Sequence, residues 1–512
     1  MGIGSAVARL ASAQYLRRIG AFMRHPLMAQ HGVLGYLLQQ GRRTRYGQQH
    51  RLDTVHGYRD FCQALPLAHY EDLEPQIEEM RRGGRNILWP GITRWFAKSS
   101  GTTGHKSKFI PVTNDALRLC HYRGGYDTLA LYIHQHPHTH FYHGKGLTLG
   151  GSHTLEKGYG KSKEGDLSAI LIQNIPRWAD FIRTPKRDVA LLADWTKKLE
   201  LIANEVVHQR VTNLSGVPSW NMVMLNYLLE VTGKPNISAL WPHLEVFFHG
   251  GVSFTPYRDQ YQRLIPSASM HYMEIYNASE GFFALQDRES SDELLLMLDY
   301  GVLYEFIPMS TFHTEHPTVL PLEGVKLGEN YALVISSTNG LWRYVIGDTV
   351  RFTNLSPYRI KITGRTRHFI NAFGEEVIVD NADQALAWAC EVTGATVTDY
   401  TASPIFMGAD AKGAHEWIVE FSTPPTSLQL FRDLMDQRLK EVNSDYEAKR
   451  RNSFTLLPPT MHAVPPGSFM QWMAQRGKLG GQNKVPRLAN NREYTEAILA
   501  FMQEAGIGME TV

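Results

Sequence analysis

Short apolar runs alternate with helical patterns through the middle of this chain, and this alternation constrains the fold more than any other feature. Runs such as Leu147–Leu149 and Ala169–Ile172 alternate with helical patterns such as Val189–Val207, and the short apolar run Leu244–Phe248 follows. Strand-length runs between helices are typical of layered α/β folds and not of helical bundles. The pattern therefore predicts an α/β protein with mixed sheets and flanking helices.

The chain is too long to form one compact core. At 512 residues it is expected to contain more than one domain. Residues 1–90 show mostly helical patterns, and further strand-like runs are Tyr331–Ile335, Thr349–Thr353 and Tyr358–Thr363. The polar, glycine-punctuated segment Gly364 to Glu376 suits a hinge. We therefore expect a large N-terminal domain, residues 1–365, and a small, mobile α+β C-terminal domain, residues 366–512.

The composition is that of an ordinary globular protein and argues against several classes of partner. The hydrophobic fraction is 43%, the charged fraction is 20% and the formal net charge is +2, so nothing favours binding to nucleic acid or to a membrane surface. The three cysteines, Cys62, Cys120 and Cys390, fit no metal pair or disulfide framework, which indicates a reducing cytoplasm. We expect small-molecule partners, no nucleic acid, no membrane, and a cytoplasmic monomer or weak homodimer.

A polar loop between two apolar segments is the first candidate for chemistry. It lies within Phe96 to Thr113, which reads FAKSSGTTGHKSKFIPVT, and every residue from Ser99 to Gly104 is Ser, Thr or Gly. Glycine allows a ligand to approach the backbone closely, while hydroxyls and the ammonium groups of Lys106 and Lys108 supply hydrogen-bond donors and positive charge. The loop is therefore a candidate to bind a polyphosphate, although it lacks the P-loop pattern G-x-x-x-x-G-K-[ST]. The alternative is a polar surface turn.

A helix is predicted after this loop, and it leads into a dense run of histidines. Thr113 can cap a helix that continues to about Ile133, and Gly124-Gly125 can bend or break it in the middle. The histidines that follow are His134, His136, His138, His140 and His143. Alternate histidines in an extended segment lie on one side and could share a metal ion. The alternative is a solvated loop, because no carboxylate or cysteine joins the spacing and Pro137 interrupts it.

Two later stretches carry groups that nucleotide chemistry needs. Gly250-Gly251 follows an apolar run and allows the backbone to pass close to a flat base. Further along, Tyr276 could stack on an adenine ring and Glu280 could bind Mg²⁺ beside phosphates. The alternatives for these two residues are a core tyrosine and a solvated glutamate.

The last third of the chain contributes three more candidates. Asp348 follows a glycine and could accept hydrogen bonds from both hydroxyls of a ribose. Arg365 begins the predicted hinge and could pair with a phosphate. Lys484 lies in the glycine- and lysine-rich segment Arg476 to Arg487. The alternatives are a plain turn residue for Asp348 and a basic surface loop around Lys484.

Taken together and in this order, these segments resemble those of the adenylate-forming superfamily, which includes acyl-CoA synthetases and luciferases. The closer resemblance is to the Gretchen Hagen, or auxin-responsive promoter, family of acyl-acid amido synthetases. The matching motifs are SSGTTGHKSKFIPVT, SGVPSW (Ser215–Trp220), YNASEG (Tyr276–Gly281), YEFIP (Tyr304–Pro308), GLWRYVIGD (Gly340–Asp348) and GQNKVPR (Gly481–Arg487). The lysine at 108 lies one residue later than in most adenylating enzymes, which favours the amide-forming branch.

The resemblance implies a role for each candidate. The residues that would bind ATP are Ser99, Ser100, Gly101, Thr102, Thr103, Lys106, Gly250, Gly251, Tyr276, Ser279, Glu280, Asp348, Arg365 and Lys484. Those that would be catalytic are Lys484, Lys108 and Thr102. Tyr276 would stack on the adenine, Glu280 would ligate Mg²⁺ and Asp348 would hold the ribose. One departure from the superfamily is at the hinge, where Arg367 stands in place of the usual aspartate.

The resemblance also implies the activity. ATP, with Mg²⁺, would convert a small carboxylic acid to an acyl-adenylate, and the acyl group would pass to the amine of an amino acid to give an amide. The acid should bind beside the helix after the phosphate loop, which makes Tyr122, Arg123 and Tyr126 candidates to line its pocket. Two alternatives remain open: an acyl-CoA ligase of the same superfamily, and a nucleotide-binding regulatory protein without catalysis.

Overall fold

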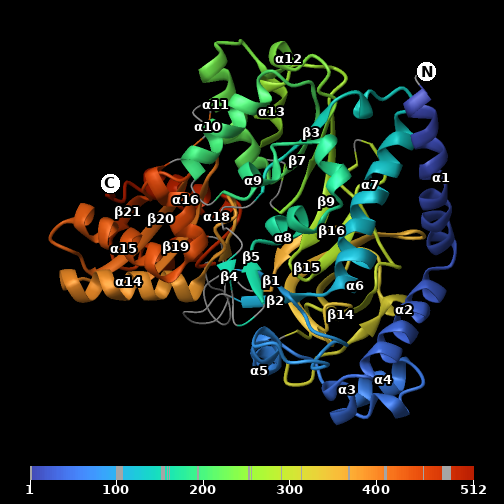
Figure 1. Ribbon diagram of the computed structural model, residues 1–512. Coiled ribbons are helices and arrows are strands. Elements are labelled where there is room, and N and C mark those ends of the chain that lie inside the picture. The colour runs from blue at the N-terminus through green and yellow to red at the C-terminus, as the bar shows by residue number, and fades with distance from the viewer. Residues whose placement is uncertain are drawn as a thin grey trace.

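The computed structural model describes most of the chain, and it contains two bodies. The described residues are 3–99, 108–150, 156–157, 160, 162–192, 195–251, 254, 257–289, 291–312, 314–366, 369–408, 412–453, 455–475 and 486–512. A large N-terminal body lies beside a smaller C-terminal body (Figure 1), and each has its own sheet. The predicted α/β class, with an additional α+β part at the C-terminal end, is confirmed.

The first ninety residues are largely helical, as predicted. The helices are α1 (Ile3–Arg24), α2 (Pro26–Gly41), α3 (Arg45–Gln49), α4 (Tyr58–Ala64) and α5 (Tyr70–Arg81). The buried amide of Gln30 on α2 donates to the carbonyls of Leu298 (2.8 Å) and Val302 (3.0 Å) and accepts from the N–H of Tyr304 (2.9 Å). A buried amide is stable only when it is paired in this way, so these bonds fix α2 against the main sheet. Within the described chain, no helix is both long enough and apolar enough to cross a membrane.

Twelve strands of the described chain form the main sheet. In spatial order they are β13 (Leu320–Pro321), β12 (Val302–Pro308), β14 (Asn330–Ser337), β15 (Tyr344–Leu355), β16 (Tyr358–Arg365), β11 (Leu294–Leu296), β10 (Gly281–Leu285), β9 (His271–Ala278), β8 (Val246–His249), β7 (Val211–Gly216), β3 (Lys145–Thr148) and β6 (Arg183–Thr184). The strands predicted near residues 244, 331, 349 and 358 lie in β8, β14, β15 and β16.

Strand β9 joins a parallel half of this sheet to an antiparallel half. It pairs in parallel with β8 and antiparallel with β10. The parallel strands β7 and β8 are buried along almost their whole length, as strands covered on both faces must be. Candidate residues from both halves can therefore meet where β9 ends.

Helices lie before and between the strands of the parallel half in the chain. They are α7 (Tyr122–Gln135), α8 (Leu167–Asn174), α9 (Arg187–Ala190), α10 (Trp195–Val206), α11 (Pro218–Thr232), α12 (Ile237–Leu240) and α13 (Arg258–Leu264). The apolar run Ala169–Ile172 lies in α8 and is helical, not extended. A run of four apolar residues satisfies a buried helix as well as a buried strand, so its pattern could not decide between them.

A second, four-stranded sheet carries the polar loop. Its order is β2 (Lys108–Val112), β1 (Trp95–Ser99), β5 (Lys163–Gly165) and β4 (Glu156–Lys157). Strands β1 and β2 pair antiparallel, with Ser99 opposite Lys108. The two ends of the polar loop are therefore fixed by a strand pair.

The helix after β2 begins as predicted but does not break at its glycines. The Thr113 hydroxyl accepts from the N–H of Ala116 (3.0 Å), and a short first helix, α6 (Asn114–Ala116), passes through a π-helical turn, η2 (Leu117–His121), into α7. Helix α7 then runs without interruption through Gly124 and Gly125, so the predicted break at these glycines is wrong. A Cβ atom at Gly124 would lie 2.5 Å from the ring of Phe282, so this glycine allows α7 to pack closely on β10.

The C-terminal body is a small α+β unit. Its elements are β17 (Phe369–Ile370), β18 (Val377–Ile378), α14 (Val379–Thr393), β19 (Thr396–Ile405), β20 (Ala414–Thr423), α15 (Leu428–Val442), α16 (Ser444–Arg450), β21 (Thr460–Val464), α17 (Ser468–Gln475), α18 (Glu493–Glu504) and β22 (Glu510–Thr511). Strands β19 to β22 form its sheet in chain order. It contacts the N-terminal body through Tyr257 of the α13 region, whose hydroxyl donates to the Ala372 carbonyl (2.6 Å).

The two adjacent glycines of α7 predict opposite effects on stability. Gly124→Ala should destabilise the protein by roughly 1–3 kcal/mol, because the added methyl group overlaps the buried ring of Phe282. Gly125→Ala, which is exposed with nothing within 4 Å of its Cβ position, should stabilise the helix by up to about 1 kcal/mol. Thermal unfolding of the two variants checks this, and equal melting temperatures would contradict the assigned role of Gly124.

Candidate active site

Of the two lysines that follow Gly104 in the polar loop, Lys106 and Lys108, the structure describes only Lys108. Carboxylates lie near its side chain. Its ammonium group is 5.5 Å from the ring centroid of Tyr70. Burial lowers the pKa of Lys108, while the carboxylates of Glu280 and Glu71 act in the opposite direction. Ser99 lies opposite Lys108 in the strand pair. The loop candidates Ser100, Gly101, Thr102, Thr103 and Lys106 lie outside the described residues.

Gly250 and Gly251 form a close turn against β9. They follow β8, whose last residue His249 pairs with Glu274. A Cβ atom at Gly250 would lie 2.3 Å from the carbonyl oxygen of Ile275, and Gly251 has a φ of +84°. Both positions therefore require glycine, and the turn leaves its backbone beside the strand that carries Tyr276.

The carboxylate of Asp348 joins Tyr276 to Arg365. The Tyr276 hydroxyl donates to Asp348 Oδ2 (2.6 Å), and Arg365 Nε donates to Asp348 Oδ1 (2.8 Å). Asp348 and Arg365 are opposite each other on β15 and β16. The ring of Tyr276 is 6% exposed and packs edge-on against Phe283, so the described tyrosine is a core residue whose hydroxyl reaches the site. Its stacking on a base stays a prediction.

Glu280 and Ser279 form the turn between β9 and β10. The backbone carbonyl of Glu280 accepts from the side-chain amide of Asn339 (2.9 Å), which holds the turn in place. Burial raises the pKa of the Glu280 carboxyl to about 7, and the charge of Lys108 opposes that rise only in part. A buried carboxylate that is so poorly solvated favours a cation beside it.

A cavity of about 250 Å³ opens beside these groups. Lys108, Gly347 and Arg365 line one part of it, and His69 and Glu71 at the start of α5 line another. Further wall residues, Phe369 and Ile378, belong to the C-terminal body. The cavity therefore lies where the polar loop, the Asp348 strand and the predicted hinge meet.

Models of one protein family match most of this chain. The GH3 family N-terminal domain matches residues 15–270, the central domain matches 295–365 and the C-terminal domain matches 380–493. The chain belongs to the GH3 family. These matches cover the polar loop, Gly250, Gly251, Asp348 and Arg365, while the β9–β10 turn lies between the first and second matched ranges.

Curated GH3 proteins resemble the chain along almost its whole length. Indole-3-acetic acid-amido synthetase GH3.4 of Arabidopsis thaliana is 22% identical and the match covers 95% of this chain and 93% of the relative. Indole-3-acetic acid-amido synthetase GH3.8 of Oryza sativa subsp. indica is 24% identical, with 90% and 87% covered.

Solved structures share the fold. The acyl acid amido synthetase AtGH3.15 in complex with 2,4-DB matches with a TM-score of 0.62 at 17% identity, covering 98% of this chain and 97% of that one. A 2-hydroxyisobutyryl-CoA ligase matches with a TM-score of 0.56 at 14% identity, covering 92% of each chain. The fold is thus shared by enzymes that form amides and by enzymes that form thioesters.

The three candidates for the acid pocket have protein partners in this GH3 chain. The Tyr122 hydroxyl donates to the Leu171 carbonyl of α8 (3.0 Å). Arg123 donates to the backbone carbonyl of Asp299 (2.7 Å) and lies 3.7 Å from its carboxylate. Tyr126 is 40% exposed and packs against Tyr15 of α1. Arg123 and Tyr126 are thus engaged at the α1–α7 side, and their contact with an acid stays a prediction.

Sequence reasoning did not single out a second carboxylate of the strand that carries Tyr276, Glu274. It lies two residues before Tyr276 on β9, so both side chains are on the same face of the strand. Burial raises the pKa of Glu274 to about 7, Asp292 adds to the rise and Arg258 opposes it. The signal that could have revealed it is an acidic residue in a strand at the spacing of Tyr276.

Arg365, near the start of the predicted hinge, lies between two carboxylates, those of Asp348 and Glu376. Burial opposes the charge of Arg365, but Asp348 and Glu376 outweigh this effect and raise its pKa. The guanidinium lies 3.7 Å from the carboxylate of Glu376, which is the last residue of the predicted hinge and has a φ of +39°. Lys484 and Arg367 lie outside the described residues. Arg365 therefore links the two bodies through carboxylates of both.

The raised pKa of Glu280 predicts a pH-dependent contribution to stability. The folded state keeps this proton up to about pH 7, whereas the unfolded chain releases it near pH 4.5. The folded state is therefore favoured by this group at low pH and loses about 3 kcal/mol as the pH rises through that window. Glu280→Gln should remove the loss, so its melting temperature relative to wild type should increase between about pH 5 and about pH 8.

The matched control is Glu323→Gln, since Glu323 is exposed. Its melting temperature should follow that of the wild type at every pH. A constant difference between Glu280→Gln and wild type across the range would show that Glu280 is ionised like a surface carboxylate, contrary to its burial.

Proposed function

We propose that this GH3 chain uses ATP to activate a small carboxylic acid as an acyl-adenylate and then transfers the acyl group to the amine of an amino acid. One observation carries the proposal: residues far apart in the sequence meet around the Tyr276–Asp348–Arg365 contact, with Glu280 and Lys108 beside it. The amido synthetase names of the curated relatives support the same activity.

Asp348 has the capacity to bind a ribose without losing its present partners. Its carboxylate accepts one hydrogen bond on each oxygen, from Tyr276 and from Arg365. Each carboxylate oxygen has a second lone pair, so two further donors can be accepted. The two ribose hydroxyls of ATP would supply those donors, while Tyr276 and Arg365 fix the direction of the carboxylate.

In the first half-reaction, an oxygen of the acid carboxylate would attack the α-phosphorus of ATP. A new oxygen–phosphorus bond forms, the bond between the α-phosphorus and the oxygen bridging to the β-phosphate breaks, and pyrophosphate leaves. Negative charge spreads over the phosphate oxygens in the transition state. Lys108 and Arg365, with the polar loop that starts at Ser99, would stabilise that charge.

The donor set at Glu280 fits Mg²⁺. The carboxylate of Glu280 is buried, which deprives it of water and raises its pKa. A bound cation would compensate for this lost solvation. Carboxylate oxygens are ligands that Mg²⁺ accepts together with phosphates. When bound, the ion would neutralise phosphate charge together with the nearby Lys108, and Glu280 would hold the ion in place.

In the second half-reaction, the amine nitrogen would attack the acyl carbonyl carbon. A carbon–nitrogen bond forms, the bond to the phosphate oxygen breaks, AMP leaves, and the nitrogen gives its extra proton to a base. We propose that the C-terminal body, residues 366–512, rotates about the segment after Arg365 between the two steps, as the family resemblance implies. The fold supports this because the sheet of that body is separate from the main sheet.

A pyrophosphate-release screen over aryl, indolyl and aliphatic acids, with and without each amino acid, tests the proposed function. We expect acid-dependent release with at least one acid and a product whose mass equals acid plus amino acid minus water.

Asp348→Asn should raise the KM for ATP by roughly 10- to 100-fold, because hydrogen bonds to a charged group are lost. Asp292→Asn, an exposed aspartate paired with Lys361, is the matched control and should behave as wild type.

The same screen separates the alternatives. A thioester formed with coenzyme A, and no amide with any amino acid, would replace the proposal with an acyl-CoA ligase. An absence of acid-dependent release across the whole panel would favour a nucleotide-binding regulatory protein.

Lys484 is expected to act in the first half-reaction only. Lys484→Ala should lower acid-dependent ATP–pyrophosphate exchange by roughly 100-fold, because a cation beside the transferring phosphoryl group is lost. Amide formation from a supplied acyl-adenylate should be retained. Lys478→Ala removes a lysine of the same segment and should leave both rates within about twofold of wild type. Unimpaired pyrophosphate release by Lys484→Ala would show that this lysine is not part of the adenylation machinery.

A further inference from the structure

Three side chains from separate elements converge at the start of β9, on the side of the parallel half of the sheet. His136 directly follows α7, His271 is the first residue of β9, and Glu289 lies between β10 and β11. One ligand atom from each lies within 4.8 Å of those of the other two. The imidazole rings of His136 and His271 are 3.8 Å apart at their centroids, and His271 Nδ1 is 2.6 Å from a carboxylate oxygen of Glu289. We call this set the His136 cluster.

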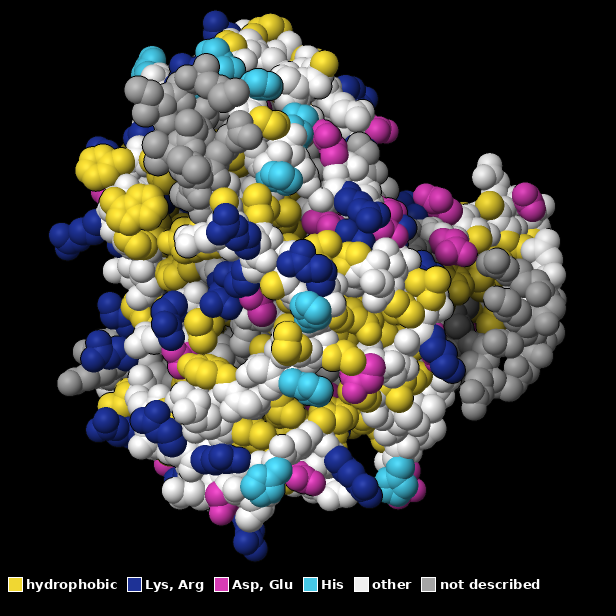
Figure 2. All heavy atoms as spheres, turned by 90° about the vertical axis from the view of Figure 1, so that its right-hand side faces the viewer, with side chains coloured by type: hydrophobic (Ala, Val, Ile, Leu, Met, Phe, Trp, Pro, Cys, Tyr) yellow, Lys and Arg dark blue, Asp and Glu magenta, His cyan; other side chains and the backbone are white. Residues whose placement is uncertain are grey.

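The other histidines of the predicted run do not join the cluster. His134, His138, His140 and His143 are exposed, and the segment after α7 contains turns instead of an extended strand. Alternate histidines therefore do not share a side, and the solvated-loop interpretation holds for these four. Figure 2 shows several histidine side chains close together near the top of one face of the molecule. A test of the His136 cluster must separate it from these neighbours.

We propose that His136, His271 and Glu289 bind a divalent transition-metal ion of the zinc class. Two imidazole nitrogens and one carboxylate oxygen form a common donor set for Zn²⁺, with a fourth position left for water. Ligands bound tetrahedrally at about 2.0–2.1 Å lie roughly 3.3 Å from one another. The three ligand atoms lie within 4.8 Å of one another, so small movements of the side chains would bring them to that spacing.

The backbone around the cluster is held by a network centred on Glu245. The N–H of His271 donates to the Glu245 carbonyl (2.8 Å), and the Glu245 carboxylate accepts from the Tyr132 hydroxyl (2.9 Å) and the His140 N–H (2.9 Å). The ring of Tyr132 also packs against both His136 and His271. Such second contacts orient metal ligands in known sites. The Glu245 carboxylate itself is occupied by these donors.

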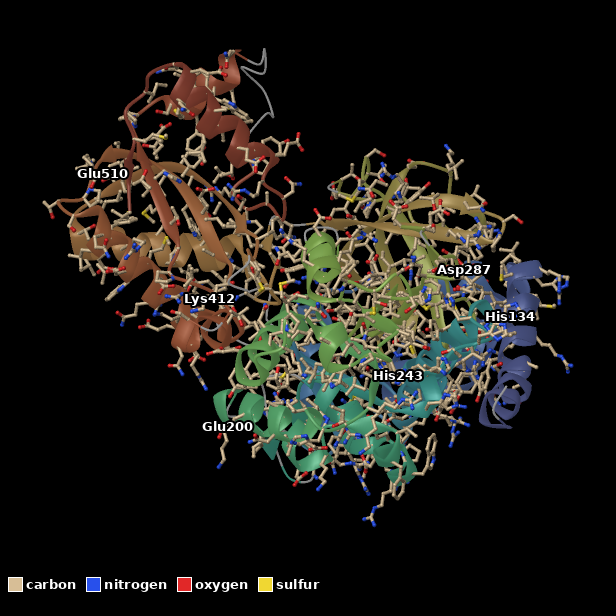
Figure 3. The ribbon with its side chains drawn as sticks, turned by 90° about the horizontal axis from the view of Figure 1, so that it is seen from above. His134, Glu200, His243, Asp287, Lys412 and Glu510 are labelled. Carbon is tan, nitrogen blue, oxygen red and sulfur yellow. The ribbon has the colours of Figure 1, made fainter. Side chains whose placement is uncertain are left out.

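The third ligand is brought to the cluster by a separate contact. The side-chain amide of Gln135, the last residue of α7, donates to the carbonyl of Asp287 (2.6 Å). Asp287 lies two residues before Glu289, and Figure 3 shows it on a segment beside that of His134. A bound ion would tie α7 to β9 and to the β10–β11 connection.

Metal titration of the full-length chain tests the proposal, which does not depend on the proposed function. Metal-free protein is titrated with Zn²⁺ by calorimetry and with Co²⁺ by visible absorption. We expect one strong site per chain with the intense absorption of tetrahedral Co²⁺. His271→Gln and Glu289→Gln should each weaken Zn²⁺ binding by at least about tenfold. His143→Gln disrupts the neighbouring His140–His143 pair, whose Nδ1 atoms are 3.1 Å apart, and should change the affinity by less than about twofold.

Thermal unfolding provides a second readout that is sensitive to the link between elements. Zn²⁺ should raise the melting temperature of wild type and of His143→Gln, but not of His271→Gln. Because Glu289 is exposed, Glu289→Gln should fold like wild type in the presence of EDTA, which keeps the test valid if a histidine variant is unstable. The proposal is overturned if wild type shows only weak Zn²⁺ sites, or if Glu289→Gln and His271→Gln bind as wild type does.

Discussion

The carboxylate of Asp348 is the contact on which the arrangement of the site depends. It accepts one hydrogen bond from Tyr276 on β9 and one from Arg365 on β16, and thereby connects three strands of the main sheet. Both partners are largely buried, so each bond forms where water competes poorly. Arg365 also lies near Glu376 of the C-terminal body. One carboxylate thus fixes the relative positions of β9, of β16 before the predicted hinge, and of the Arg365 guanidinium between the two bodies.

A second buried ion pair holds the strand that carries Asp348. Arg343, one residue before β15, has a φ of +44° and pairs through two nitrogens with Glu305 of β12, at 2.9 and 3.0 Å. It also donates to the Leu65 carbonyl (2.7 Å) between α4 and α5. A backbone conformation that L residues rarely adopt persists only where its surroundings enforce it. The helical N-terminal segment therefore supports the site indirectly, although it contributes little chemistry of its own.

The sequence was sufficient for features with a local cause. Apolar runs predicted the strands β14 to β16, and the hydroxyl of Thr113 predicted the helix cap that it forms. The need for glycine at 250 and 251 was predictable because two glycines directly follow an apolar run. Features that depend on contacts between distant segments were not predictable. Gly124 looked like a helix breaker because Phe282, which requires it, lies on another strand. The partners of His136 were missed for the same reason, since His271 and Glu289 are far from it in the chain.

The site also concentrates carboxylates in a way that stability alone would not favour. Glu274 and Glu280 are both buried enough for their pKa values to reach about 7, so the folded protein pays to ionise them at neutral pH. Lys108 offsets only part of this cost, because its own pKa is lowered by burial. A core designed for stability would replace such groups with apolar side chains. The presence of Glu280 beside Asp348 is explained if a ligand that carries cations and hydrogen-bond donors completes the site, because binding then restores the interactions that burial removed.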